Sequence, residues 1–245
     1  MSRIADNMQD VHARIAAAAG KVSRDVQTVR LLAVSKTFDA QAVLAAAVAG
    51  QRDFGENYLQ EALEKIDEFT RLQNNGALPA GVDAGLLKWH FIGPIQSNKT
   101  RPLAERFDWV HAVDRLKIAQ RLSEQRPSHL PPLNICIQVN ISAEDSKSGV
   151  APDDVQVLAQ EIATLPRLRL RGLMAIPRAV DDPDAQREPY RRLHALYCRL
   201  QEAGPPLDTL SIGMSGDLEA AIAEGATIVR IGSAIFGQRN QGTTT

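Results

Sequence analysis

The chain has 245 residues, 44% of them hydrophobic and 23% charged, a composition typical of globular domains and unlike that of disordered or collagen-like chains. Its 28 basic residues nearly balance 29 acidic ones, which argues against nucleic acid or an anionic membrane as the partner. Two cysteines, Cys136 and Cys198, are too few for a disulfide framework, and no Cys/His set has the spacing of a metal site.

The sequence also lacks the marks of membrane insertion or export. Its longest apolar run, Val43–Ala49, is far shorter than the roughly 20 residues of a membrane helix. Asp6 and Asp10 interrupt the N-terminal region where a signal peptide would have an apolar core. We therefore expect a cytoplasmic protein.

Eight short apolar or β-branched runs recur along the chain, and helix-forming segments lie between them. The starts of these runs are about 28 residues apart on average, which is the length of one strand–helix unit. The predicted strands are Leu31–Lys36, Asp53–Asn57, Lys88–Gly93, Trp109–Val113, Asn134–Asn140, Leu168–Ile176, Thr209–Met214 and Thr227–Gly232. The predicted helices are Ala40–Ala49, Tyr58–Phe69, Asp114–Arg126, Pro152–Thr164, Pro183–Glu202 and Leu218–Glu224.

This alternation in about 250 residues predicts an α/β fold, a single (β/α)8 TIM barrel. An open, doubly wound sheet is the alternative. We expect one domain over residues 1–245, with an extra helix at about Ser2–Ala19 before the first strand. Gln73–Gly85 is predicted to be a loop insertion and the polar tail Gln238–Thr245 to be frayed.

Active sites of such barrels lie at the C-terminal ends of the strands. Lys36 ends the first predicted strand, and it either extends its ammonium out of the barrel mouth or forms a Schiff base. His90, in the third strand, is either a hydrogen-bonded core residue or a catalytic group. Met174, near the end of the sixth strand, either fills the barrel or supports an aromatic ligand.

The last two predicted strands end in turns of small, donor-rich residues, Ser211–Asp217 and Arg230–Ser233. Small residues let the backbone approach an anion, and the loops after strands 7 and 8 are the usual phosphate site of this fold. The alternative is that Ser215 or Asp217 caps a helix and the glycines only form turns. Taken together, the two turns favour a phosphate site.

A lysine across the barrel mouth from a phosphate site suggests pyridoxal 5′-phosphate (PLP), with its aldehyde on Lys36 and Arg230 near the pyridine nitrogen or the phosphate. An arginine beside the ring nitrogen would disfavour its protonation and weaken the cofactor as an electron sink, so we do not expect a transaminase. A further interpretation is a cofactor-free enzyme acting on a sugar phosphate, in which Lys36 is an acid/base group.

Eight motifs together carry a resemblance to a known family: LLAVSKT at 31–37, FGENY at 54–58, WHFIGPIQSNK at 89–99, QVNIS at 138–142, SKSG at 146–149, RGLMAIP at 171–177, SIGMSGD at 211–217 and VRIGSAIFG at 229–237. The sequence resembles the pyridoxal phosphate homeostasis proteins, also called proline synthase co-transcribed homologues. The resemblance implies a fold-type III barrel similar to the N-terminal domain of alanine racemase.

The resemblance also implies a set of cofactor-binding residues. PLP would be attached to Lys36, with the ring near Arg230. The phosphate contacts would be Ser211, Ser215, Gly232 and Ser233. Asn57, His90, Met174 and Met214 complete the expected set. Many members carry Arg-x-Tyr after the glycine matching Gly237, whereas here the sequence continues with Gln238.

Two functional classes compete for this set of residues. The favoured one is a non-catalytic protein that buffers PLP and delivers it to apo-enzymes in vitamin B6 and amino-acid homeostasis, as a monomer or weak homodimer. The alternative is an amino-acid racemase or decarboxylase that uses the Lys36 Schiff base. Racemases of this type need a tyrosine from a second domain of a partner subunit, and we expect no such domain here, because the sequence stops shortly after the last predicted strand.

Overall fold

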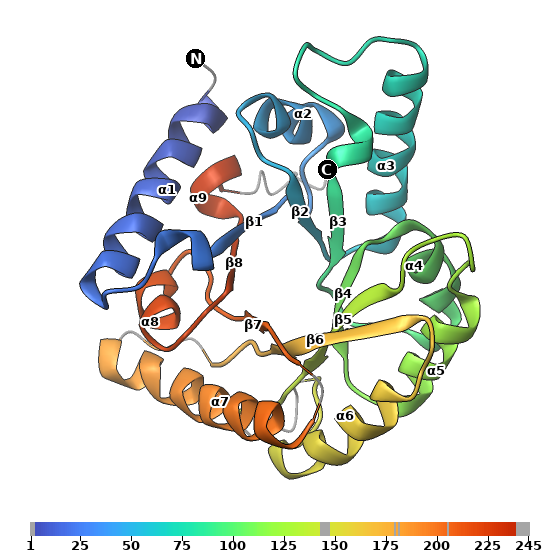
Figure 1. The fold of residues 1–245 in the computed structure, drawn as a ribbon. Helices are drawn as coiled ribbons and strands as arrows, with labels where there is room; N and C mark the ends of the chain where they lie inside the picture. Colours follow the sequence, from blue (N-terminus) through green and yellow to red (C-terminus); the bar gives the residue numbers. More distant parts are fainter. Residues whose placement is uncertain (1–2, 143–147, 179, 181, 205, 239–245) are drawn as a thin grey trace, which may run out of the picture.

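The computed structural model of the protein describes residues 3–142, 148–178, 180, 182–204 and 206–238. Their central feature is a closed barrel of parallel strands in sequence order, surrounded by helices (Figure 1). The strands are β1 (Arg30–Val34), β2 (Asp53–Glu56), β3 (Lys88–Phe91), β4 (Trp109–Val113), β5 (Leu133–Gln138), β6 (Leu168–Met174), β7 (Thr209–Ser211) and β8 (Ile228–Ile231). Because β1 pairs with β8, the predicted (β/α)8 barrel is confirmed and the open sheet is excluded.

The helices occupy the outside of the barrel. They are α1 (Arg3–Lys21), α2 (Ala40–Val48), α3 (Leu59–Asn74), α4 (Thr100–Arg106), α5 (Leu116–Gln125), α6 (Val155–Ala163), α7 (Pro183–Ala203), α8 (Leu218–Ala223) and α9 (Ser233–Phe236). Short 3₁₀ turns are η1 (Val26–Thr28), η2 (Ala84–Leu86), η3 (Ser97–Lys99) and η4 (Pro152–Asp154). Several helices begin at a capping aspartate, as at Asp39, whose side chain accepts a hydrogen bond from the backbone N–H of Ala42.

The extra N-terminal helix α1 packs against α8 and α9 (Figure 1). Its buried residues Met8, Val11 and Ile15 are three or four positions apart, so they form one apolar face. The polar side of α1 also makes a specific contact. Arg14 pairs with Glu219 of α8 at 3.0 Å and donates to the carbonyl oxygen of Ser215 at 3.2 Å. Thus α1 supports the loop that follows β7.

The barrel interior combines apolar and polar side chains. Leu32, Val34, Ile92 and Ile228 form a buried apolar cluster of their own. At the start of β4, the ring of Trp109 is covered by the Arg171 guanidinium, which lies 4.5 Å from the ring centroid. Buried polar side chains fill the remaining space.

The differences from the expected elements are local. Helices α4 and α9 were not predicted, because α4 is short and contains Pro102, and α9 follows β8 without a polar linker. The predicted loop Gln73–Gly85 begins inside α3 and ends inside η2. Of the predicted frayed tail, Gln238 is described, and residues 239–245 lie outside the described residues.

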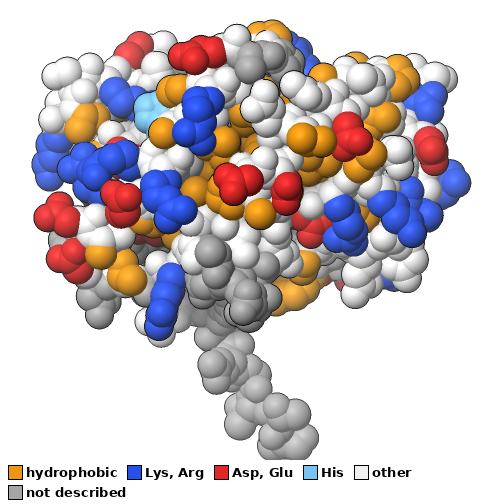
Figure 2. Space-filling view, turned by 90° about the horizontal axis from the view of Figure 1, so that it is seen from below, with side chains coloured by type: hydrophobic (Ala, Val, Ile, Leu, Met, Phe, Trp, Pro, Cys, Tyr) orange, Lys and Arg blue, Asp and Glu red, His pale blue; other side chains and the backbone are white. Residues whose placement is uncertain are grey.

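Two further findings concern the helices and the surface. None of the helices in the described ranges is long and apolar enough to cross a membrane. On the face shown in Figure 2, the described acidic and basic side chains are intermingled rather than gathered by sign. This mixture agrees with the near balance of charges in the sequence.

Candidate functional site at the barrel mouth

A cavity of about 740 Å³ lies at the C-terminal ends of the strands. Seven of the ten expected cofactor-binding residues line it: Lys36, Asn57, Met214, Ser215, Arg230, Gly232 and Ser233. They come from segments after β1, β2, β7 and β8 and from β8 itself. Closure of the barrel therefore brings together residues that lie far apart in the sequence.

Lys36 and Asn57 form one side of this cavity. Lys36 is half-buried, two residues beyond the end of β1, and Asn57 directly follows β2. The side-chain oxygen Oδ1 of Asn57 is buried and has no hydrogen-bond partner in the described structure. A buried acceptor without a donor costs free energy, so this oxygen is suited to accept a hydrogen bond from a ligand.

The two small-residue turns also line the cavity, and the turn after β8 lies beside the end of β1, the strand that Lys36 follows. The hydroxyl oxygens of Ser215 and Ser233 lie 3.3 Å apart, so the turns after β7 and β8 meet at this point. Gly213, in the first turn, has a φ of 90°, and a Cβ there would lie 2.5 Å from the Cβ of Ala221. A Cβ on Gly232 would lie 3.0 Å from the carbonyl oxygen of Val34. Glycine is therefore required at Gly213, and the space at Gly232 is tight for any side chain.

The turn after β7 is held from behind by a carboxylate. Asp217 accepts hydrogen bonds from the backbone N–H of Met214 at 2.5 Å and from the hydroxyl of Tyr190 at 2.7 Å. Burial is the main cause that raises the pKa of Tyr190 above its ordinary value, and the Asp217 charge adds to it. Tyr190 thus acts as a neutral donor that fixes Asp217 and, through it, the turn.

Arg230 reaches the cavity from inside the barrel. Its side chain is buried, and it donates to the backbone carbonyl of Ser211, to the Ser211 hydroxyl oxygen at 3.0 Å and to the carbonyl of Ala175 at 3.0 Å. Burial lowers the pKa of Arg230 from its ordinary value. A guanidinium remains charged at neutral pH even so, and Arg230 therefore presents a fixed positive charge to the cavity.

A series of buried hydrogen bonds continues from Arg230 into the barrel, and we call it the interior network: Asp53, His90, His111, Ser211 and Arg230. Asp53 Oδ1 lies 3.0 Å from His90 Nε2, and His90 Nδ1 lies 2.9 Å from His111 Nε2. His111 Nδ1 lies 2.8 Å from the Ser211 hydroxyl oxygen. Both imidazoles are completely buried.

The charges at the two ends of the interior network determine its tautomers. Burial opposes the charge on Asp53, but His90 and the nearby Arg30 and Lys88 outweigh it and lower the Asp53 pKa, so this carboxylate accepts from His90 Nε2–H. Burial lowers the pKa of both histidines, which favours their neutral forms. Each imidazole then carries its proton on Nε2, and the Ser211 hydroxyl donates to His111 Nδ1 while accepting from Arg230.

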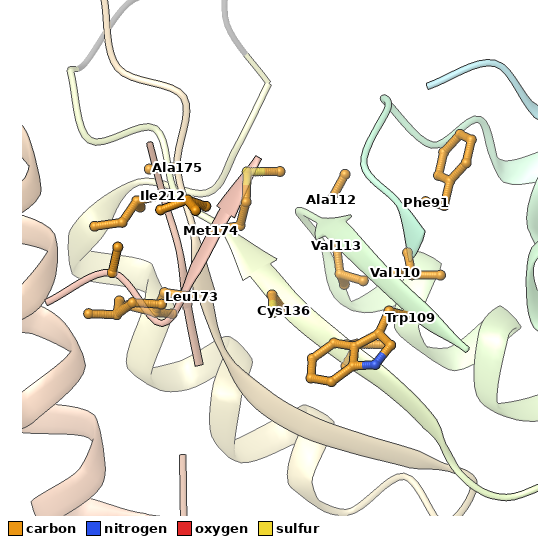
Figure 3. Close-up of a cluster of buried hydrophobic side chains, with 14 of the residues drawn as sticks. Phe91, Trp109, Val110, Ala112, Val113, Cys136, Leu173, Met174, Ala175 and Ile212 are labelled. Carbon is orange, nitrogen blue, oxygen red and sulfur yellow. The ribbon is translucent and has the colours of Figure 1, made fainter. Parts of the chain in front are cut away.

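Three expected residues do not line the cavity: His90, Met174 and Ser211. For His90, the structure supports the hydrogen-bonded core residue over the catalytic group, because its two ring nitrogens contact Asp53 and His111. Met174 is completely buried and lies in the apolar cluster drawn in Figure 3. Ser211 lies behind Arg230, and its hydroxyl oxygen is engaged by Arg230 and His111.

The structure adds cavity-lining residues that sequence reasoning did not select. They are Val34, Phe38, Ile92, Ile176, Gly216, Gly237 and Gln238. Phe38 stacks on Phe236 of α9 with ring centroids 5.2 Å apart, so this pair joins the turn after β1 to the turn after β8. Alternation along β1 and β3 could have identified Val34 and Ile92 as inward-facing. The stacking of Phe38 on Phe236 could not be predicted from the sequence, because the two residues are far apart along the chain.

Comparisons with known proteins agree with this geometry. The family described as alanine racemase, N-terminal domain, matches residues 7–240. The pyridoxal phosphate homeostasis protein of Pseudomonas aeruginosa is 60% identical over 242 residues, which are 99% of this chain and 98% of that protein. The protein of the same name from Escherichia coli strain K12 is 52% identical over 240 residues, 98% of each.

A solved structure extends the comparison. PipY of Synechococcus elongatus, in its PLP-bound form, is 33% identical with a TM-score of 0.79, and the match covers 96% of this chain and 100% of that one. The sequence identity, the barrel and the full-length matches point to the same group. The chain belongs to the pyridoxal phosphate homeostasis protein family, within the family of the alanine racemase N-terminal domain.

Proposed function

We propose that the protein binds PLP covalently through Lys36, and that it buffers the cofactor and delivers it to apo-enzymes. The observation that carries the proposal is that Lys36 and the hydroxyl-bearing turns at Ser215 and Ser233 line one cavity. Lys36 would hold the cofactor through a C=N bond between its amine and the aldehyde carbon of PLP, with water as the other product. The PLP-bound PipY, a full-length match, supports the same ligand for this cavity.

The cavity fits this cofactor in three respects. Its volume of about 740 Å³ lies within the range of sites for small molecules. The turns at Gly213 and Gly232 bring backbone and hydroxyl donors close to where a phosphate would lie. Arg230 supplies a positive charge, and the orphaned Oδ1 of Asn57 supplies an acceptor.

The described residues favour a carrier over a racemase. A racemase needs a proton-exchanging group on each face of the cofactor. Of the groups that line the cavity, Lys36 is an amine, whereas Arg230 stays protonated and cannot act as a base. Tyr58 is exposed, and Tyr190 donates to Asp217, so neither lies opposite Lys36 at the cavity wall. We propose that catalysis by the protein itself is inefficient.

We also propose that the protein acts in the cytoplasm. Cys136 and Cys198 are free cysteines, and Cys136 is completely buried. Burial raises the pKa of the Cys136 thiol to about 12, so it stays a neutral core side chain. Unpaired cysteines suit the reducing compartment of the cell.

Borohydride reduction followed by peptide mass mapping tests the attachment. The protein is incubated with PLP, reduced and digested, and the phosphopyridoxyl group is expected on Lys36. Lys99, which follows β3 outside the cavity lining, serves as the internal control. A label on Lys99 with Lys36 unmodified would contradict the proposal, and so would the absence of a label.

A further inference from the structure

An ion cluster lies beside Lys36, outside the residues that line the cavity: Lys65 and Glu56, which are buried, and Glu61, whose side chain is 30% exposed. The ammonium of Lys65, on α3, donates to Glu56 Oε1 at 2.8 Å, to Glu61 Oε1 at 2.6 Å and to the backbone carbonyl of Ser35 at 2.8 Å. Its three N–H donors thus have three acceptors. The side chains of Lys65 and Glu56 are only 4% and 0% exposed.

The cluster contacts both sequence neighbours of Lys36. On one side, Ser35 accepts from Lys65 through its carbonyl, and its hydroxyl donates to Glu56 Oε1 at 2.6 Å. On the other side, the backbone N–H of Thr37 donates to Glu61 Oε1 at 2.6 Å. The backbone of Lys36 therefore lies between two residues that the same cluster holds in place.

Thr37 has an unusual backbone conformation at this point, with a φ of 68°. A β-branched residue is rarely found in the left-handed region, and such a conformation persists only where surrounding contacts enforce it. The bond from Thr37 N–H to Glu61 is one such contact. The left-handed turn redirects the chain immediately after Lys36, whose side chain lines the cavity.

The energetics of the cluster point to geometry rather than stability as its role. Burying charged groups is costly, and well-packed apolar residues in place of a buried ion cluster often give equal or greater stability. Glu56 Oε2 is buried without a hydrogen-bond partner, and burial raises the Glu56 pKa despite the nearby Lys65. What apolar residues could not reproduce is the directional hold on Ser35 and Thr37.

We propose that Lys65 is a positioning residue for Lys36: together with Glu56 and Glu61 it fixes the backbone at 35–37, so that the Lys36 amine meets the cofactor's aldehyde. The inference rests on the proposed attachment of PLP to Lys36. Lys65 itself is not among the residues that line the cavity, and it acts through the backbone on either side of Lys36.

The test compares two ligands that differ only at the reacting carbon. PLP carries an aldehyde, whereas pyridoxine 5′-phosphate carries an alcohol and cannot condense with an amine. In the Lys65→Met variant, we expect the affinity for PLP to fall at least tenfold and the affinity for pyridoxine 5′-phosphate to change less than twofold. Equal loss for both ligands, or no loss for either, would overturn the proposal.

Two further variants keep the test decisive. Lys65→Met leaves Glu56 and Glu61 without their cation, so its folding is checked by thermal unfolding. If it does not fold, the Glu56→Gln/Lys65→Met double variant also removes the charge of the buried acid Glu56, and the aldehyde-specific loss of affinity is expected to remain in it. Glu64→Gln, at an exposed position on the same helix, is the matched control and should bind both ligands as the wild type does.

Failure of the proposed function would look different. If borohydride reduction in the presence of PLP leaves Lys36 of the wild type unlabelled, the proposed attachment is refuted. This result does not depend on the Lys65 variants. If wild-type Lys36 is labelled and Lys65→Met binds PLP unchanged, only the role of Lys65 is refuted.

Discussion

Tyr190 donates its hydroxyl hydrogen to Asp217 Oδ2 at 2.7 Å, which connects α7 to the turn after β7. The other oxygen of Asp217 accepts from the backbone N–H of Met214, so the bond from Tyr190 helps to set the shape of a turn that lines the cavity. Tyr190 therefore stabilises the turn through Asp217.

This contact predicts the effect of Tyr190→Phe. Loss of one buried hydrogen bond should lower the free energy of unfolding by about 1 kcal/mol and weaken PLP binding several-fold, because the turn loosens. Urea unfolding and absorbance titration measure the two effects. Tyr197→Phe is the control, since Tyr197 donates to the carbonyl of Leu207 away from the cavity. This variant should lower the free energy of unfolding and leave the PLP affinity unchanged. Unchanged PLP affinity in Tyr190→Phe would contradict this account.

The serine and glycine turns predict how the phosphate is held. A charge-assisted hydrogen bond contributes roughly 1.5–3 kcal/mol, so Ser215→Ala should weaken PLP binding about tenfold to a hundredfold. Gly232→Val should weaken it more, because its Cβ would lie 3.0 Å from the Val34 carbonyl. Pyridoxal, which has no phosphate, should bind the wild type poorly and respond little to Ser215→Ala. If both variants weaken pyridoxal as much as PLP, the phosphate is held elsewhere.

The carrier hypothesis predicts that common amino acids are not racemised at a useful rate. No described tyrosine lies at the cavity wall, and Arg230 cannot accept a proton. Chiral chromatography after long incubation of the PLP-loaded protein with each amino acid measures the outcome. Robust turnover that disappears in Lys36→Ala would refute the hypothesis.

The interior network predicts a pH dependence of stability. His90 and His111 have pKa values below the ordinary 6.5, so on acidification the unfolded chain takes up their protons before the folded one does. The free energy of unfolding should therefore fall as the pH decreases below about 6.5, by up to about 1.4 kcal/mol per pH unit for each histidine.

Urea unfolding at several pH values measures the slope of the free energy of unfolding against pH in the wild type and in two variants. His111→Gln should reduce the slope, and His12→Gln, at an exposed position on α1, should leave it unchanged. The raised pKa of Glu56 acts in the opposite direction, but it contributes equally to all three proteins and cancels from the differences. A His111→Gln slope equal to that of the wild type would show that the buried imidazoles are not neutral.

Sequence reasoning located all eight strands, because parallel strands covered by helices are short apolar runs at regular spacing. It also selected seven residues of the cavity wall, since strand order alone places Lys36 and Gly232 at the same end of a barrel. It could not place His90 against His111, because that contact depends on the register between strands. The cluster around Lys65 was missed for a similar reason: a lysine on a helix ordinarily faces solvent, and only the packing of α3 buries this one.

The pairing of β1 with β8 has a consequence for the protein during its synthesis. Lys36 follows the first strand, whereas Arg230 belongs to the last strand and Gly232 directly follows it. Leu32 is directly opposite Arg230 in the closed barrel. Synthesis from the N-terminus therefore produces Lys36 well before the residues proposed to hold the phosphate. Under the proposed function, a chain without β8 would present the lysine but would lack the turn proposed to hold the phosphate. We therefore expect PLP to be retained only by chains in which β1 and β8 have paired.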